Sequence, residues 1–124
     1  MILLDTSALV LSLTGKRPQL ARLEELVNAG ERLALPALVL YEWLRGPRTA
    51  EELAIQEELF PSEEAVPFES RAAAIAADLY GRLGRPRPRQ IDLAIAGTTL
   101  AAGATLWTLN TADFGDVPGL RLLA

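Results

Sequence analysis

Short apolar runs alternate with longer stretches in which apolar residues recur at helical spacing. The runs that suit buried strands are residues 2–4, 32–35, 65–68, 104–109 and 120–123. The stretches that predict helices are residues 8–13, 18–28, 36–45, 49–60, 69–83 and 90–102. Strands that alternate with helices, with no tight hairpin between them, favour a layered α/β/α domain around a mainly parallel sheet of four to five strands. We expect the whole chain, residues 1–124, to form a single domain.

Three stretches carry more local detail. The helix over residues 36–45 is apolar almost all round, which predicts burial on every side, and Glu42 is its only acid. Thr49 and Glu52 have the spacing of a capping box that opens the next helix. Residues 81–89 contain four arginines and two prolines, and prolines at alternate positions predict a stiff, exposed loop without helix.

The helix over residues 90–102 contains several small residues. Ala94, Ala96 and Gly97 lie within four positions of one another, so a neighbouring element can approach this helix closely. We therefore expect tight packing there. Gly103 then ends the helix, as glycine commonly does.

Composition removes several kinds of chemistry. The chain has no histidine and no cysteine, so it holds no serine–histidine triad, no histidine-based ribonuclease site and no thiolate metal site. Hydrolytic chemistry must then come from carboxylates, Lys16, tyrosines or a hard metal ion held by oxygen ligands. No apolar run approaches the ~18 residues that span a bilayer, and no signal peptide is evident. A cytoplasmic protein without a membrane partner fits these features best.

The net charge of −4 looks unfavourable for a protein that binds nucleic acid. The net charge of the remaining surface is different if four acids are sequestered around metal ions. Twelve of the 16 acids then remain to balance the 12 basic residues. The rest of the surface would be neutral overall and can carry local basic patches. Net charge therefore leaves the choice of partner open.

Asp5 follows directly on the first apolar run and precedes Thr6 and Ser7. Such a residue lies at the carboxyl end of a strand, where open α/β sheets place their ligands. The same three residues also suit the first turn of a helix, so one of them can simply cap it. This stretch alone leaves both interpretations open.

Three further acids stand out by position. Glu42 lies in an apolar helix, Asp92 begins the small-residue helix, and Asp113 follows the strand over 104–109. Each has a structural explanation alone: a polar stripe for Glu42, the helix dipole for Asp92, and an Asx turn for Asp113. Together with Asp5 they converge on one edge of a parallel sheet, where mutual repulsion raises the pKa of some carboxylates. A hard cation such as Mg²⁺ or Mn²⁺ resolves that repulsion.

These acids and their neighbours resemble a known family. Residues 5–9 (DTSAL), 42–46 (EWLRG), 92–96 (DLAIA) and 108–114 (TLNTADF) are similar to the motifs of PIN domains, and more narrowly to those of the VapC toxins of toxin–antitoxin pairs. The resemblance spans the whole chain. Residues 92–114 are its most specific part, and the region around Glu42 is its least specific part.

The resemblance implies an endoribonuclease that depends on Mg²⁺ or Mn²⁺. It implies Asp5, Glu42 and Asp92 as the central acids, with Asp113 completing the site. Members differ over whether the position of Asn110 or that of Asp113 supplies the last ligand, and we favour Asp113. Supporting polar residues are Thr6, Ser7, Thr108 and Asn110. Where members often carry a basic residue between the threonine and the asparagine, this chain has Leu109, which leaves the metal site intact and weakens a potential RNA contact.

Three arginines beside Asp92 are candidates for binding RNA phosphates: Arg85, Arg87 and Arg89. An ordinary solvated loop explains them equally well. The resemblance further implies a homodimer and a cognate VapB-like antitoxin that covers apolar surface on the early helices. Trp43 is a candidate contact for that antitoxin, with core packing as the alternative.

Two other enzyme classes and one non-enzyme class compete with this interpretation. A phosphatase of the haloacid-dehalogenase type also uses a strand-end aspartate, but it carries a second acid two residues later, where this chain has Ser7. A response-regulator receiver requires an acidic pair earlier in the chain, and none precedes Asp5. A PIN nuclease outside a toxin–antitoxin pair, or a PIN-like module that only binds RNA or protein, stays open. The non-catalytic module predicts a missing central acid, and all four acids are present.

Overall fold

The computed structural model describes residues 1–15 and 17–124, and Lys16, one of the groups considered for chemistry, lies outside the described residues. The elements, in chain order, are β1 (Ile2–Leu4), α1 (Thr6–Leu13), α2 (Arg17–Asn28), β2 (Leu33–Ala34), α3 (Ala37–Arg45), α4 (Ala50–Leu59), η1 (Ser62–Glu64), α5 (Ser70–Arg82), η2 (Arg87–Arg89), α6 (Gln90–Ala101), β3 (Thr105–Trp107), α7 (Thr111–Phe114) and β4 (Arg121–Leu122).

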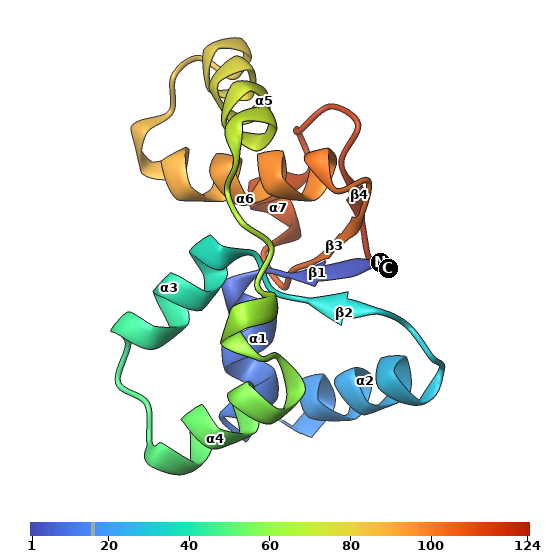
Figure 1. Cartoon of the computed structure of the whole chain (residues 1–124). Helices are drawn as coiled ribbons and strands as arrows, with labels where there is room; N and C mark the ends of the chain where they lie inside the picture. Colours follow the sequence, from blue (N-terminus) through green and yellow to red (C-terminus); the bar gives the residue numbers. More distant parts are fainter. Residues whose placement is uncertain (16) are drawn as a thin grey trace.

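The four strands form one sheet in the order β2-β1-β3-β4, and each neighbouring pair is parallel. Figure 1 shows the sheet between two helical layers, with α5 and α6 on one side and α1, α2 and α4 on the other. This arrangement confirms the predicted α/β/α architecture with a parallel sheet. The central strand β1 is buried along its whole length, because helices cover both faces of the sheet.

The segment 65–68 does not form the predicted strand. It makes a single parallel bridge between Pro36 and Val66, in which the Val66 amide donates to the Leu35 carbonyl and the Ala37 amide donates to the Val66 carbonyl. Helix α3 begins at Ala37 and the η1 turn ends at Glu64, so neither chain stays extended for long beside this bridge and the ladder stops there. The prediction of a strand was therefore wrong, and this segment only extends the edge beyond β2.

The proline-rich segment 85–89 contains a short 3-10 turn, although its alternating prolines were expected to exclude any helix. Pro88 sits in the first turn of η2, where the missing amide proton costs nothing, and the Arg89 amide donates to the Pro86 carbonyl at 2.8 Å. The alternating prolines thus prepare the start of α6. Another unexpected helix is α7, a single turn directly after the β3 edge.

Helix α3 is buried on one side only, which corrects the prediction of burial all round. Val39 and Trp43 are fully buried, whereas Tyr41 is 55% exposed and Leu44 is 51% exposed. Because the Trp43 side chain has no accessible surface, it is a core residue, so of its two interpretations core packing holds and the antitoxin contact does not. The apolar surface that α3 does expose belongs to Tyr41 and Leu44.

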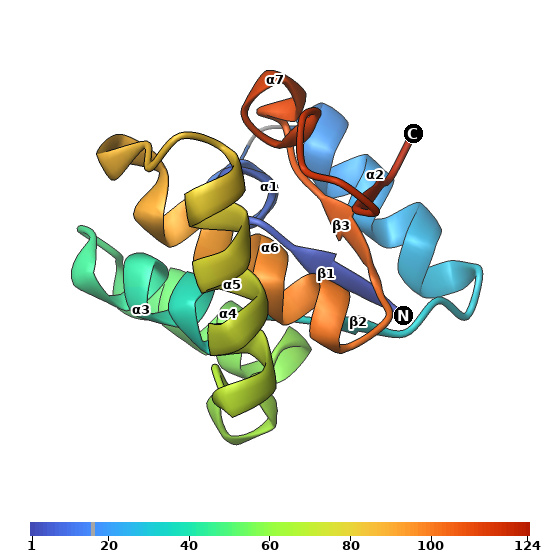
Figure 2. The same cartoon turned by 90° about the horizontal axis from the view of Figure 1, so that it is seen from above.

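Two local predictions hold. Thr49 and Glu52 form the complete capping box at the start of α4, with both reciprocal hydrogen bonds. Gly97 lies against α5 so closely that a Cβ atom there would be 2.7 Å from the Ala72 carbonyl oxygen. Figure 2 shows α5 crossing over α6, and this close approach fixes α6 in place. Among the described residues, no helix is long and apolar enough to cross a membrane.

Candidate active site

Four acids lie at the carboxyl end of the parallel strands. Asp5 follows β1, Glu42 is on α3, Asp92 is in the first turn of α6, and Asp113 is on α7 after β3. Figure 1 shows the end of β1 and the starts of α3 and α6 toward the same end of the sheet. An open cavity of about 420 Å³ is lined there by Asp5, Thr6, Ser7, Val10, Leu11, Glu42, Asp92 and Asn110. The structure thus brings three of the four acids into one cavity.

Asp5 is buried, with only 3% of its surface exposed. It occupies the N-cap position of α1, but its carboxylate makes no capping hydrogen bond. Its Oδ2 atom instead accepts hydrogen bonds from the Thr108 hydroxyl at 2.8 Å and the Ser7 hydroxyl at 3.1 Å. Burial without a cap role means that the position of this carboxylate is set by the two hydroxyls.

The two hydroxyl residues are themselves held by the main chain that follows β3. The Leu109 amide donates to the Ser7 hydroxyl, and the Asn110 amide donates to the Thr108 hydroxyl, both at 3.0 Å. The loop between β3 and α7 is therefore connected through hydroxyls to Asp5. Ser7 and Thr108 were both predicted as supporting residues, and the structure places both beside Asp5.

Glu42 is connected to α1 and to its own helix. Its Oε1 atom accepts a hydrogen bond from the Thr6 hydroxyl at 2.6 Å, and its Oε2 atom lies 3.3 Å from Arg45. The Arg45 guanidinium also lies over the Tyr41 ring, 5.2 Å from the centroid. These three α3 side chains form the polar stripe that was one explanation for Glu42. The contact with Thr6 adds a link from that stripe to the cavity.

Asp92 carries the clearest electrostatic sign of a functional site. Its pKa is raised from 3.8 to about 6, first by burial and then by the negative charges of Asp5, Asp113 and Glu42, while Arg89 opposes the shift. This result confirms the expectation that converging carboxylates raise a pKa among themselves. Perturbed carboxylates in an open cavity mark candidate functional sites, because folding alone gains nothing from such repulsion.

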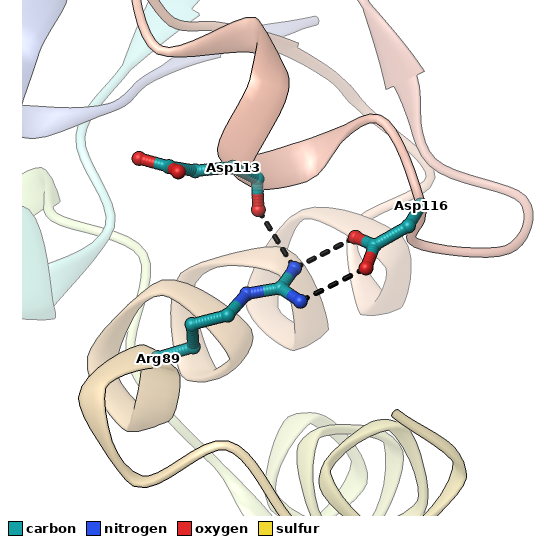
Figure 3. Close-up of polar contacts among 3 residues, drawn as sticks. All are labelled: Arg89, Asp113 and Asp116. Carbon is teal, nitrogen blue, oxygen red and sulfur yellow. Dashed lines mark hydrogen bonds and ion pairs between the residues drawn. The ribbon is translucent and has the colours of Figure 1, made fainter. Parts of the chain in front are cut away.

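Asp113 is exposed on α7 and does not line the cavity, although its charge acts on Asp92. Its backbone carbonyl accepts a hydrogen bond from Arg89 at 2.8 Å, and Arg89 also forms a bidentate ion pair with Asp116. Figure 3 shows the Asp113 carboxylate extending away from that guanidinium. Arg89 is thus engaged within the chain, whereas Arg85 and Arg87 are exposed.

Three residues around this site were not predicted from the sequence. Val10 and Leu11 line the cavity, and they follow Thr6 and Ser7 by four positions on α1, so helical spacing places them on the same face. Asp116 was missed because nothing in the local pattern connects it with Arg89, which is 27 residues away.

The oxygen-bearing side chains that line the cavity are of the kinds that a hard divalent cation prefers as ligands. Asp5, Glu42 and Asp92 supply carboxylate oxygens, and Asn110 supplies an amide. Among the described residues, however, no three acids form a ready-made group of metal ligands. The raised pKa of Asp92, which comes first from burial and then from repulsion by neighbouring carboxylates, supports the fit, because a cation would neutralise that repulsion.

The family model for the PIN domain matches residues 2–120. The chain belongs to the PIN domain family. It is 36% identical over 128 residues to Ribonuclease VapC19 of Mycobacterium tuberculosis strain H37Rv, a match that covers 98% of each chain. The similarity to this relative therefore extends over nearly the whole chain and beyond the motifs around the acids.

Solved structures share the fold of this PIN domain. VapBC2 from Rickettsia felis, bound to a DNA fragment from its promoter, superposes with a TM-score of 0.77 at 24% identity over 99% of this chain and 98% of that chain. FitAcB from Neisseria gonorrhoeae superposes with a TM-score of 0.74 at 22% identity over 99% and 97%. The four-stranded parallel sheet and its helical layers are therefore those of a PIN fold.

Proposed function

We propose that this PIN domain is an endoribonuclease that hydrolyses RNA phosphodiester bonds with Mg²⁺ or Mn²⁺, and that it is the toxin of a VapBC-type toxin–antitoxin pair. The observation that carries the proposal is the open cavity lined by Asp5, Glu42 and Asp92, in which burial and then the charges of the neighbouring carboxylates raise the pKa of Asp92 to about 6. The relative named Ribonuclease VapC19 supports the choice of substrate. Residues 1–124 would form a single nuclease domain.

The carboxylates of Asp5, Glu42 and Asp92 would hold the ion, with Asp113 as the last acid. When bound, a divalent ion stabilises charge on the phosphate and activates water for attack. The chain's own part is to orient those ligands: Ser7 and Thr108 fix Asp5, and Thr6 fixes Glu42. Such second-layer hydrogen bonds keep metal ligands in position and in the charged state.

Arg85 and Arg87 support the proposal that the substrate is RNA. Both are exposed, and both lie in the loop that leads into α6 and Asp92. Arginine side chains match phosphate oxygens with paired donors, so these two are the proposed contacts to the RNA backbone. Arg89 is not among the proposed phosphate contacts, because its guanidinium donates hydrogen bonds to the Asp116 carboxylate and the Asp113 carbonyl.

The partners proposed are a VapB-like antitoxin and a second copy of the chain. The Rickettsia felis structure contains a VapBC2 assembly, which supports an antitoxin partner for this chain. Self-association would use exposed apolar surface, of which α3 carries Tyr41 and Leu44. A cytoplasmic location stays a prediction. A short antitoxin-like reading frame immediately upstream of the gene would distinguish a toxin from other PIN nucleases.

The test is cleavage of a panel of structured RNAs by the purified protein, with Mg²⁺ or Mn²⁺, with chelator, and with Asp5→Asn. Asp78→Asn is the matched control, because Asp78 is an exposed acid on α5 that forms an ion pair with the surface residue Arg82. We expect cleavage that needs the metal and is lost in Asp5→Asn but kept in Asp78→Asn.

Two outcomes would contradict the proposal. Cleavage that survives both chelator and Asp5→Asn would exclude metal-assisted hydrolysis at this cavity. RNA binding without cleavage of any RNA in the panel, together with no Mn²⁺ binding in calorimetry, would favour the non-catalytic PIN-like module. Calorimetry matters here because it does not depend on finding the right RNA.

A further inference from the structure

Helix α7 is too short to hold its own orientation. It contains only Thr111–Phe114, and a single helical turn is not stable in isolation. Gly115, Pro118 and Gly119 follow it, so the next segment cannot extend the helix. Contacts with the rest of the protein must therefore determine where Asp113 lies.

One such contact is apolar. Phe114 is 1% exposed and packs in the core beneath α7. A single buried side chain fixes one point of a helical turn but leaves rotation about that point. Asp113, the residue before Phe114, is exposed and has no comparable apolar anchor of its own.

Arg89 provides the second contact. Its Nη1 and Nη2 atoms donate to the two carboxylate oxygens of Asp116 at 2.9 and 2.7 Å, and Nη2 also donates to the Asp113 carbonyl at 2.8 Å. Figure 3 shows the guanidinium between these two residues, with the Asp113 carboxylate directed away from it. Arg89 therefore binds the main chain of Asp113 and leaves the carboxylate available.

Arg89 also connects α7 to the start of α6. Arg89 immediately precedes α6 and lies three residues before Asp92. Its side chain is 23% exposed, and its Nε atom is buried without a hydrogen-bond partner among the described residues. An unpaired buried donor is unfavourable, so Nε does not hold the side chain in place. Its position is instead determined by the three hydrogen bonds that Nη1 and Nη2 donate.

We propose that Arg89 is a positioning residue, which holds the Asp113 main chain against the start of α6 and so presents the Asp113 carboxylate to the metal site that Asp92 lines. This inference rests on the proposed function. It assigns Arg89 a role different from phosphate binding, and it gives Asp116 a role that no motif indicated. Neither residue would touch the RNA or the ion.

Two other roles for Arg89 predict different results. If its charge alone mattered, removing a cation beside Asp92 and Asp113 would tighten the binding of a divalent ion. If it contacted RNA phosphates, its removal would weaken RNA binding and leave the ion's affinity unchanged. Only the positioning role predicts weaker ion binding after the charge is removed.

The experiment is Mn²⁺ titration by calorimetry, without RNA, on the wild-type protein and on Arg89→Gln, Asp116→Asn and Arg82→Gln. Arg82 is the matched control, because it forms an exposed pair with Asp78 on α5 at 2.8 Å. We expect Mn²⁺ affinity to fall about tenfold in Arg89→Gln and less in Asp116→Asn. Arg82→Gln should keep the wild-type affinity. Unchanged or tighter binding in Arg89→Gln would overturn the proposal.

Amide hydrogen exchange supplies a readout that needs no metal. Release of α7 should accelerate exchange over residues 110–117 in Arg89→Gln, with little change in β1 and β3. Equal exchange in that segment would show that Arg89 does not hold α7 and would also overturn the proposal. If the wild-type protein binds no Mn²⁺, the proposed function fails, and hydrogen exchange still decides whether Arg89 anchors α7.

Discussion

The Thr108 hydroxyl donates to the Asp5 carboxylate at 2.8 Å and joins residues 103 positions apart in the chain. The two residues end neighbouring parallel strands, because β1 pairs with β3 in a register that matches Leu4 with Trp107. Asp5 directly follows Leu4, and Thr108 directly follows Trp107. The sheet therefore places the hydroxyl beside the carboxylate, and the contact belongs to the fold as well as to the site.

Replacing Thr108 by valine should weaken the metal site without unfolding the protein. Valine keeps the shape of threonine but cannot donate to Asp5, so the Asp5 carboxylate loses one of two hydroxyl partners. Loss of such a second-layer contact lowers metal affinity by about ten- to a hundredfold. Calorimetric titration with Mn²⁺ measures the change.

Thr105→Val is the matched control for that substitution, because Thr105 lies at the other end of the same strand. It should leave Mn²⁺ affinity near the wild-type value. Equal affinities of the Thr108→Val and wild-type proteins would show that the hydroxyl does not position Asp5.

The convergence of Asp5, Glu42 and Asp92 was predictable because it follows from topology. A short apolar run before Asp5 indicates a buried strand, and parallel strands bring their carboxyl ends to one edge. Side-chain pairs formed across the fold were not predictable in the same way. The Arg89–Asp116 pair depends on how α7 turns after β3, and the local sequence contains no periodic signal for a four-residue helix.

The rotation of helix α3 relative to the core was also not predictable from the sequence. When nearly every position is apolar, the pattern has no polar face to set the rotation of the helix. The pattern therefore predicted burial on every side and did not indicate that Tyr41 and Leu44 would be exposed. The segment 65–68 was also mispredicted, since its apolar residues favour a strand, while its partner chain turns into helix α3 at Ala37 and ends the pairing after one bridge.

Asp92→Asn should stabilise the metal-free protein at neutral pH. Between the ordinary pKa of 3.8 and the folded value of about 6, the folded protein binds the proton more tightly than the unfolded chain does. Stability from this group is therefore greatest below the ordinary pKa and declines as pH rises toward 6. The variant, which lacks the charge, should melt about 5 °C higher at pH 7 and no higher at pH 4.

Adding Mn²⁺ should reverse that order at pH 7. The ion binds the charged carboxylates of the wild-type protein and raises its Tm by mass action, whereas the variant lacks one ligand. Thermal melts at pH 4 and pH 7, with Mn²⁺ and with chelator, check both expectations. A constant Tm difference between the two proteins at all pH values would show that Asp92 does not titrate in this range.

Gly97→Ala should destabilise the fold by about 1–3 kcal/mol. The new Cβ atom would lie 2.7 Å from the Ala72 carbonyl oxygen and 3.0 Å from the Ala76 Cβ atom, so α5 and α6 must separate. Gly81→Ala is the control, because Gly81 is also helical and a Cβ atom added there would meet nothing within 4 Å. That change should stabilise the protein by about 0.5–1 kcal/mol. Chemical denaturation gives both values, and equal signs for the two variants would contradict the close packing of α5 on α6.

Leu44→Glu should convert the proposed homodimer into a monomer. Tyr41 and Leu44 are three positions apart on α3, so they share one helical face, and both are more than half exposed. An apolar face of this kind is favourable only when a partner covers it, and a buried glutamate at its centre would oppose association. Sedimentation velocity at micromolar concentration should show the lower mass for this variant. Leu59→Glu is the control, since Leu59 is 42% exposed on α4, and it should leave the mass of the wild-type assembly unchanged. A dimer that persists in Leu44→Glu would exclude α3 as the interface.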